Sequence, residues 1–476
     1  MTPDPAGWNL QHSYAQLPKM FYQAVEPVPV VAPRLVVVNH ALAATLGLTL
    51  SEDDALAECL SGNKLLPDSQ PLAMAYAGHQ FGHFNKLGDG RAHLLGEQNG
   101  FDIQLKGSGQ TPYSRRGDGR AALAPMLREY IMSEAMFALG IPTTRSLAVV
   151  STGEPVMRET LLEGAILTRV AASHLCVGTF EYAASFGNKE ELTALVKYAI
   201  LRHYPERAAA KNPAFALLDA VVERQAALIA KWMLIGFIHG VMNTDNMSIA
   251  GETIDYGPCA MMDAYHPQTV FSSIDHQGRY AYANQPPIAQ WNLARLAESL
   301  LPLLDAEPSK ANTLAQEALG KFHTLFSQHW LAGMRAKLGL FGEEVEDLAL
   351  IESLLEWMQQ HQADYTNTFR HLDPEAAHSA DADFVAGHRR WQARLARNTK
   401  PLKSSRCLMQ ASNPAIIPRN HRVEEALVVA TERHDFSVMH RLLAALAKPF
   451  AEVVEYAEYS EPPAPSSLPY YTFCGT

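Results

Sequence analysis

Apolar residues are spaced differently in the first and second parts of this sequence. Up to residue 170, short apolar or alternating runs are separated by Gly-rich turns, as is typical of strands joined by loops. Strands are predicted at 35–38, 92–95, 101–105, 146–150 and 165–170. Helices are predicted at 39–47, which ends on a glycine, and at 123–139, which is followed by Gly140 and Pro142.

After Gly187 the apolar residues recur every three or four positions, which predicts helices almost throughout. These helices are expected at 189–203, 213–238, 287–304, 310–338, 344–362 and 421–433. Residues 373–383 have the composition of a linker. We therefore expect an α+β, two-lobed fold with a mixed-sheet N-lobe at 71–180 and a larger helical C-lobe at 181–460. An N-terminal extension at 1–70 and a flexible tail at 461–476 would flank the lobes.

The composition is that of an ordinary globular protein, with 47% apolar and 19% charged residues among 476. A net charge of -11 argues against bulk binding to nucleic acid or to an anionic membrane. The sequence shows neither a signal peptide nor a membrane span, so a cytoplasmic location is expected. Five scattered cysteines give neither a zinc pattern nor a disulfide framework.

The most informative motif runs from His239 to Asn246 and is followed by Asp255-Tyr-Gly. A protein-kinase catalytic loop reads His-x-Asp-x-x-x-x-Asn, in which the Asp accepts the proton of the attacking hydroxyl and the Asn binds a metal ion. Here Val241 occupies the position of that Asp, and Asp245 is the obvious substitute. Asn246 and Asp255 are oxygen donors suited to Mg²⁺ or Mn²⁺. The alternative is an Asx-rich turn without a ligand.

Lys106 ends an alternating strand, and Glu129 lies on the next predicted helix. In kinases a strand lysine contacts nucleotide phosphates and is positioned by a helix glutamate. Either residue alone is more simply explained as a solvated surface charge. Together with Asn246 and Asp255, the pair favours a nucleotide site.

Two Gly-Asp-Gly-Arg segments, at 88–91 and 117–120, are candidates for phosphate binding, because glycine lets backbone N–H groups approach phosphate oxygens and arginine adds charge. The second segment follows the strand lysine, whereas the Gly-rich loop of a kinase precedes it. The phosphates would then lie in a different direction. A Gly-rich loop alone is usually only a set of turns.

His79 and His83 have the spacing of metal ligands, but no glutamate accompanies them in the zincin arrangement. We therefore interpret them as loop or packing histidines.

These motifs resemble the selenoprotein O family of protein adenylyltransferases, pseudokinases that transfer AMP from ATP to hydroxyl side chains of proteins. The resemblance rests on long segments at 76–82, 105–120, 140–145 and 413–420. It implies a kinase-like fold in which ATP binds in the reverse direction, with its α-phosphate at the transfer site. It further implies that ATP is contacted by Gly88, Gly90, Arg91, Lys106, Asp118, Gly119 and Arg169, and also by Asp255 through the metal. Glu129 would hold Lys106, Asn246 and Asp255 would bind Mg²⁺ or Mn²⁺, and Asp245 would be the base.

The sequence departs from the family in two places. Cys176 stands where the family has a second phosphate-binding arginine, seven residues after Arg169. Cys474 matches a terminal selenocysteine or cysteine of relatives, but Phe271 stands where some bacterial relatives have a partner cysteine. Two alternatives to adenylyl transfer therefore stay open, a phosphotransferase and a non-catalytic nucleotide-binding scaffold.

Overall fold

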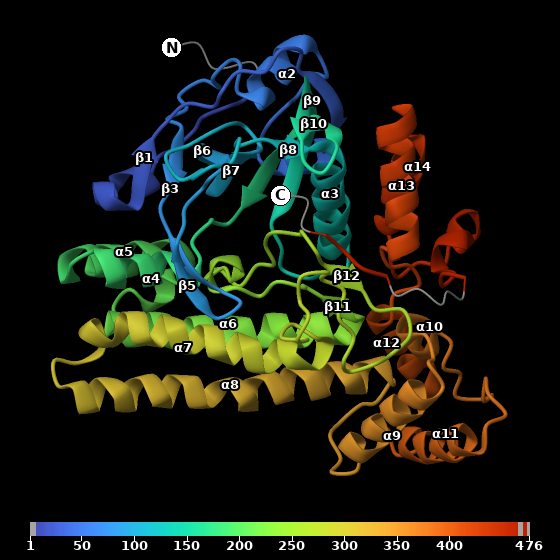
Figure 1. Ribbon diagram of the computed structural model, residues 1–476. Coiled ribbons are helices and arrows are strands. Elements are labelled where there is room, and N and C mark those ends of the chain that lie inside the picture. The colour runs from blue at the N-terminus through green and yellow to red at the C-terminus, as the bar shows by residue number, and fades with distance from the viewer. Residues whose placement is uncertain (1–5, 465–469, 474–476) are drawn as a thin grey trace.

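An antiparallel sheet occupies one end of the protein, and long helices occupy the other, in this computed structural model that describes residues 6–464 and 470–473 (Figure 1). The strand order in the eight-stranded sheet is β1-β3-β6-β7-β10-β9-β2, and β8 pairs with β10. The strands are β1 (Tyr22–Ala24), β2 (Arg34–Val38), β3 (Leu72–Met74), β6 (Ala92–Gln98), β7 (Phe101–Lys106), β8 (Ala121–Ala122), β9 (Arg145–Met157) and β10 (Leu161–Ala171). Residues 1–70 therefore contribute two strands to this sheet, in addition to the short helices α1 (His40–Thr45) and α2 (Asp54–Ser61).

Helix α3 (Leu123–Ala138) packs against β9 and β10 and runs from the sheet toward the helical end (Figure 1). It ends at Gly140, whose φ of +75° is one that glycine adopts without strain. A separate hairpin of β4 (Ala77–Gln80) and β5 (His83–Lys86) descends to helix α4 (Val177–Phe186) and to the turn Thr244–Asn246. Helix α3 and this hairpin thus connect the two ends of the protein.

Three long helices form the base of the helical end, namely α6 (Pro213–Ile235), α7 (Gln285–Leu304) and α8 (Pro308–Lys337), with α5 (Lys189–His203) against α6. The chain between α6 and α7 is mostly loop and contains the short hairpin of β11 (Phe237–Ile238) and β12 (Ala260–Met261). The buried apolar side chains of these helices form a closely packed core, which supports that loop.

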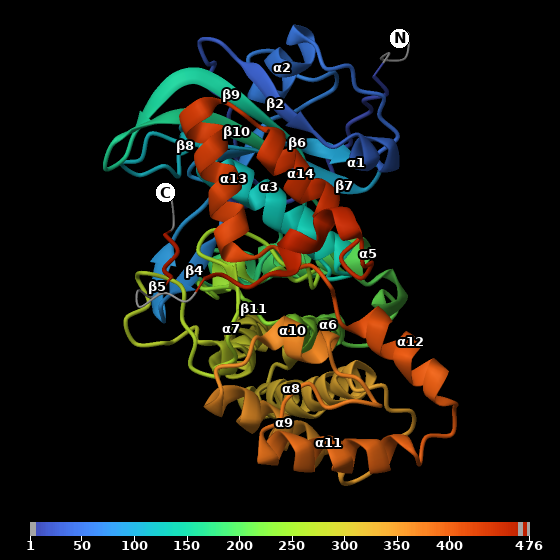
Figure 2. The same cartoon turned by 90° about the vertical axis from the view of Figure 1, so that its right-hand side faces the viewer.

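The C-terminal third forms two groups of helices. Helices α9 (Asp347–Gln360), α10 (Tyr365–Arg370), α11 (Ala382–Leu395) and α12 (Leu402–Ser412) gather beyond one end of α8. Helices α13 (Asn420–Arg433) and α14 (Ser437–Leu446) return to pack against α3 (Figure 2). The C-terminal chain therefore supports the helix that carries Glu129.

The expected combination of a sheet end and a helical end is confirmed. The mixed sheet expected for the N-lobe is wrong, because every strand pair of the eight-stranded sheet is antiparallel. The other corrections are local. The helix predicted at 213–238 ends at Ile235, because Gly236 adopts a left-handed conformation and Phe237–Ile238 pair as a strand. The helix predicted at 344–362 spans Asp347–Gln360. Helices α2, α4, α10, α11, α12 and α14 and the strands β1, β3, β4, β5, β8, β11 and β12 were not predicted. Apart from α11 with 14 residues and α12 with 11, each spans ten residues or fewer and depends on tertiary contacts. Within the described residues, none of the helices combines the length and apolarity needed to cross a bilayer.

Part of the segment expected to be a flexible tail is docked on the loop that follows Asp255. The backbone N–H of Thr472 donates to the Phe271 carbonyl oxygen at 2.8 Å, and its hydroxyl donates to the Pro258 carbonyl oxygen at 2.6 Å. The rings of Phe271 and Tyr470 pack with their centres 5.9 Å apart. Cys474 lies outside the described residues.

Candidate active site

A polar cleft of about 910 Å³ lies between the sheet, the Gly-rich loop 107–120 and the loop after α6. Every residue predicted to touch nucleotide, metal or acceptor lines this one cleft: Gly88, Gly90, Arg91, Lys106, Asp118, Gly119, Arg169, Asp245, Asn246 and Asp255. Glu129 lies behind Lys106 and is bonded to it. The fold thus brings together residues separated by up to 167 positions in the sequence, from Gly88 to Asp255.

Four buried or partly buried charges form a compact cluster in the wall of the cleft. Lys106 Nζ donates to Glu129 Oε2 at 2.6 Å and to Asp255 Oδ1 at 2.5 Å. Arg169 reaches the same two carboxylates, with Nη2 at 2.6 Å from Glu129 Oε1 and 3.3 Å from Asp255 Oδ1. The cluster has two positive and two negative charges, so its members compensate one another in low dielectric.

The contacts with Lys106 and Arg169 lower the pKa values of Asp255 and Glu129. Burial alone would raise the pKa of Asp255, but the charges of Lys106 and Arg169 outweigh it and hold that pKa well below its usual range. The pKa of Glu129 is lowered in the same way, with Arg169 as the larger cationic influence. Both carboxylates are therefore ionised at neutral pH.

Asp255 is held in an uncommon backbone conformation, with a φ of +61°. Its position is fixed by His239, whose imidazole Nε2 lies 2.9 Å from the Ile254 carbonyl oxygen. The other imidazole nitrogen, Nδ1, accepts the backbone N–H of Val241 at 3.4 Å. The buried histidine of the motif thus joins the loop 239–246 to the segment that presents Asp255, which is a positioning role.

The side-chain amide of Asn246 faces the cleft in a defined orientation. Its Nδ2 donates to the Val241 carbonyl oxygen at 3.1 Å, within the same loop. This bond engages the nitrogen and leaves the Oδ1 oxygen as the group able to act as a ligand. Asn246 and Asp255 consequently supply one neutral and one anionic oxygen donor to the cleft.

Asp245 is packed closely against the β4–β5 hairpin. A side chain at Gly78 would collide with its carboxylate, so only glycine permits this approach. The oxygen Oδ1 is buried without a hydrogen-bond partner among the described residues. Burial raises the pKa of Asp245 to about 7, and the charges of Asp255 and Glu181 act in the same direction. An acid with this pKa is suited to accept a proton near neutral pH.

The two loop histidines have different surroundings. His79 forms a short ion-pair contact with the buried Glu181, which also accepts the hydroxyl of Thr244, next to Asp245. The backbone N–H of His79 donates to the same hydroxyl at 2.7 Å. His79 therefore braces the loop of Asp245, whereas His83 is exposed on β5.

Positive charge gathers at the end of the cleft formed by the Gly-rich loop. Arg91, Arg115 and Arg116 line it, and within the described part of the chain none of the three has a carboxylate at ion-pair distance. Such arginines are available for an anionic ligand. Gly119, with a φ of +71°, lets the loop fold back on the backbone of Gly109.

Asp118 and Arg120 are engaged within the protein at this end of the cleft. Asp118 pairs with Arg158, whose Nη1 lies 2.7 Å from Oδ2. Arg120 donates to the carbonyl oxygens of Val28 and Pro29 at 3.0 and 2.9 Å. Arg158 is a lining residue that the sequence did not indicate, because it lies 40 positions from Asp118, in the turn between β9 and β10, and approaches it through the pairing of β8 with β10.

Cys176 lines the cleft and caps the first turn of α4 through Thr179. Burial raises the pKa of its thiol to about 12, so it is neutral at physiological pH. Cys176 thus supplies no charge to the cleft.

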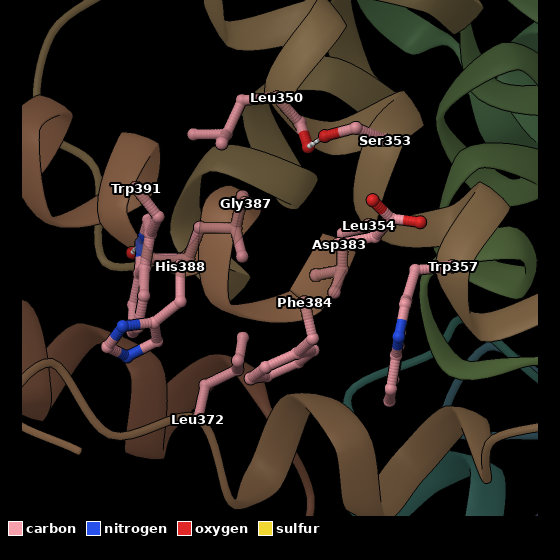
Figure 3. Close-up of a pocket in the computed structure, with 11 residues that line it drawn as sticks. Leu350, Ser353, Leu354, Trp357, Leu372, Asp383, Phe384, Gly387, His388 and Trp391 are labelled. Atoms are coloured by element: carbon pink, nitrogen blue, oxygen red, sulfur yellow. Dashed lines mark hydrogen bonds between the residues drawn. The ribbon is translucent and has the colours of Figure 1, made fainter. Parts of the chain in front are cut away.

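A second pocket, between α9 and α11, has a different character (Figure 3). Trp357, Phe384 and Trp391 point into it, and Ser353 donates its hydroxyl to the Leu350 carbonyl oxygen rather than to the pocket. The indole of Trp391 likewise donates to the Leu338 carbonyl oxygen. The lining is mostly apolar and, among the described residues, includes the carboxylate of Asp383 but no arginine or lysine, so this pocket is poorly suited to a phosphate.

Comparisons with known proteins agree with the geometry of the cleft. The family model described as protein adenylyltransferase SelO matches residues 7–447. Proteins called protein nucleotidyltransferase YdiU from Nitrosococcus oceani and Alkaliphilus metalliredigens are 60% and 61% identical, over 99% of this chain and 98% of their own length. One of the same name from Halalkalibacterium halodurans is 60% identical over 100% of this chain and 99% of its own. The chain therefore belongs to the SelO family of protein adenylyltransferases, enzymes of the transferase class.

Proposed function

We propose that this protein transfers AMP from ATP to Ser, Thr or Tyr hydroxyls of other proteins and releases pyrophosphate. The proposal includes a kinase-like two-lobed fold, with residues 71–180 as the sheet lobe and 181–460 as the helical lobe. The observation that carries it is the balanced cluster of Lys106, Glu129, Arg169 and Asp255, which opens into the same cleft as Asp245. Kinase-like sites use such a lysine, glutamate and aspartate to hold a nucleotide.

The phosphates are proposed to lie between Lys106 and the free arginines of the Gly-rich loop. Lys106 and Arg169 now contact Asp255. They would contact the α- and β-phosphates when the carboxylate of Asp255 binds the metal instead. Gly88, Gly90, Asp118 and Gly119 would shape the backbone around them. Arg91, Arg115 and Arg116 have no carboxylate at ion-pair distance within the described residues. They support a reversed nucleotide, because Arg115 and Arg116 belong to the Gly-rich loop that follows Lys106 in the chain and lines the same cleft.

Asn246 and Asp255 are proposed to hold Mg²⁺ or Mn²⁺. Their amide and carboxylate oxygens fit hard cations, and the hydrogen bond from Asn246 Nδ2 leaves its oxygen for the ion. No cluster of three or more His, Cys, Asp or Glu ligands occurs in the described residues, so phosphate oxygens and water would complete the coordination. When bound, the ion neutralises charge on the phosphates.

Asp245 is proposed to be the general base. The acceptor oxygen forms a bond to the α-phosphorus, its proton passes to Asp245, and the bond from the α-phosphorus to the bridging oxygen breaks, which releases pyrophosphate. Lys106, Arg169 and the loop arginines hold the charge of the departing pyrophosphate. Glu129 touches no substrate in this scheme and positions Lys106.

Labelled ATP tests the proposal directly. Transfer of label from the α-phosphate to protein, lost in the Asp245→Ala and Asp255→Ala variants, is the expected result. Transfer from the γ-phosphate alone would instead indicate a phosphotransferase. ATP binding without transfer of either label would indicate a nucleotide-binding scaffold, for which the neutral Cys176 is the one supporting observation.

A further inference from the structure

A second cleft of about 620 Å³ adjoins the candidate active site. Phe81 and Ile274 line both clefts, so the two are adjacent. Its other walls come from β5, from the loop 275–279 and from the start of α7, through His83, Asp275, His276, Gln277, Arg279, Asn284, Pro287 and Ile288. We refer to this cleft as the hairpin groove, since the β4–β5 hairpin forms one side of it.

The hairpin groove is attached directly to the loop that carries Asp245. Asn243 Oδ1 accepts the backbone N–H of Phe81 at 3.0 Å from one wall and the hydroxyl of Tyr280 at 2.7 Å from the other. The Phe81 and Tyr280 rings pack with their centres 5.1 Å apart. A ligand in the groove would therefore lie at a fixed position relative to Asp245, the proposed base, which is two residues after Asn243.

Among the described residues that line the hairpin groove, Arg279 is the only arginine, and there is no lysine. Within the described chain, Arg279 forms no ion pair with a carboxylate. Its guanidinium lies over the Trp291 ring, 4.9 Å from the centre, and its buried Nε has no hydrogen-bond partner among residues 6–464 and 470–473. Asp275, the acid of the groove, is already engaged, because its two oxygens accept the backbone N–H groups of Arg279 and Tyr280 at 2.9 and 2.8 Å. A preoriented arginine without an anion is suited to bind a carboxylate from outside.

The remaining charged or titratable groups of the hairpin groove are His83 and His276, both exposed. Neither adds negative charge to it. The groove is thus neutral to positive in a protein whose net charge is -11. This contrast favours an acidic ligand at this place over a basic one.

We propose that the hairpin groove binds the acceptor polypeptide beside its target hydroxyl, and that Arg279 recognises an Asp or Glu side chain close to that hydroxyl. The inference rests on the proposed adenylyl transfer and adds the class of acceptor. The acceptor lies extended between the β4–β5 hairpin and the loop 275–279. Its hydroxyl reaches the active site past Phe81 and Ile274.

The test is a peptide library with one fixed Ser, Thr or Tyr and randomised neighbours, incubated with the full-length enzyme and α-labelled ATP. The wild-type enzyme is expected to enrich Asp and Glu near the labelled residue. Arg279→Gln should remove the enrichment and lower kcat/KM for acidic peptides about tenfold through KM, with ATP affinity unchanged. Arg279→Lys keeps the charge and should retain part of the preference.

Arg295→Gln is the matched control, because Arg295 also lies over Trp291, at 4.7 Å, but is paired with Glu298 and lies outside the hairpin groove. It should keep the wild-type preference. Labelled peptides without acidic enrichment, or an enrichment that survives in Arg279→Gln, would overturn the assignment of the groove and leave the transfer activity standing. Absence of label in every peptide and protein acceptor would overturn the proposed function and the groove assignment together.

Discussion

Replacing Glu129 by Gln tests whether the buried charge cluster positions Lys106 or merely fills the wall of the cleft. Glu129 is 2% exposed and accepts bonds from both cations of the cluster, at 2.6 Å from Lys106 Nζ and at 2.6 Å from Arg169 Nη2. The variant leaves these two cations with Asp255 as their single carboxylate. Its amide keeps one oxygen acceptor but has no charge.

The loss of stability follows from this geometry. Removing one partner of a buried ion pair costs about 3–5 kcal/mol, and the retained oxygen places Gln near 3 kcal/mol. With an unfolding entropy of about 2.1 cal/mol/K per residue, a chain of 476 residues loses about 1 °C of Tm per kcal/mol. We expect Tm to fall by about 3 °C.

The kinetic effect should be larger and should appear in kcat. Without the Glu129 carboxylate, Lys106 Nζ keeps its contact with Asp255 at 2.5 Å but loses the second contact that fixes its position. A misplacement of about 1 Å relative to the proposed phosphate position would cost roughly 100-fold. ATP affinity should not fall, because the cluster gains one net positive charge and the ligand is a polyanion. Steady-state transfer from α-labelled ATP and calorimetric titration with ATP measure the two effects separately.

Glu134→Gln provides the control on the same helix. Glu134 pairs with Arg145 at 2.5 Å but lies outside the cleft, so its loss should lower Tm with kcat unchanged. A Glu129→Gln enzyme with kcat near the wild type would refute the positioning role. A loss confined to ATP affinity would refute the charge argument.

Three further variants test other parts of the protein. Asp245→Asn should reduce transfer by about 100-fold or more with ATP binding retained, as measured by the same two assays, and a transfer rate near the wild type would exclude Asp245 as the base. Cys176→Arg should raise kcat/KM about tenfold by adding a phosphate contact, whereas Cys176→Ser should not; equal activities would show that this position no longer faces phosphate. Lys337 is 2% exposed, lies over the rings of Tyr365 and Phe369, and has its pKa lowered by burial to about 7. Because the unfolded chain holds this proton up to about pH 10.5, Lys337→Met should stabilise the protein most at pH 7 and below, by at most about 5 kcal/mol, with the gain vanishing as pH approaches 10.5. Denaturant unfolding at pH 7 and pH 10 measures this gain, and an equal gain at both pH values would contradict it.

Long periodic elements were the part of the fold most accessible from sequence. Helices α3, α5, α6 and α8 were predicted within a few residues, since their apolar faces repeat over several turns and their ends carry Asn, Pro or Gly signals. Short elements such as α4 and β4 have no such repeat. They form because Ala77 and Gly178 meet closely, a contact between residues 101 positions apart.

Most candidate residues of the site could also be named from the sequence, because their types and order match a chemistry that needs a lysine, an acid and oxygen ligands. Arg169 was indicated only by the resemblance to the family. The sequence did not show which side chains contact one another in the folded protein. Asp118 is paired with Arg158 because β8 pairs with β10. Arg120 donates to the carbonyl oxygens of Val28 and Pro29, which belong to a loop far earlier in the sequence. No local pattern encodes such a pairing.

The linear order of residues thus determined the family and the chemical groups available, since both depend on residue identity at short spacings. Only the tertiary structure decided the charge state of those groups and the existence of the hairpin groove. Burial, neighbouring charges and the approach of β4 to the loop of Asp245 are properties of packing in three dimensions. The carboxyl group of Asp245, which we propose as the base, would have an ordinary pKa in an extended chain, whereas burial beside Gly78 raises that pKa to about 7.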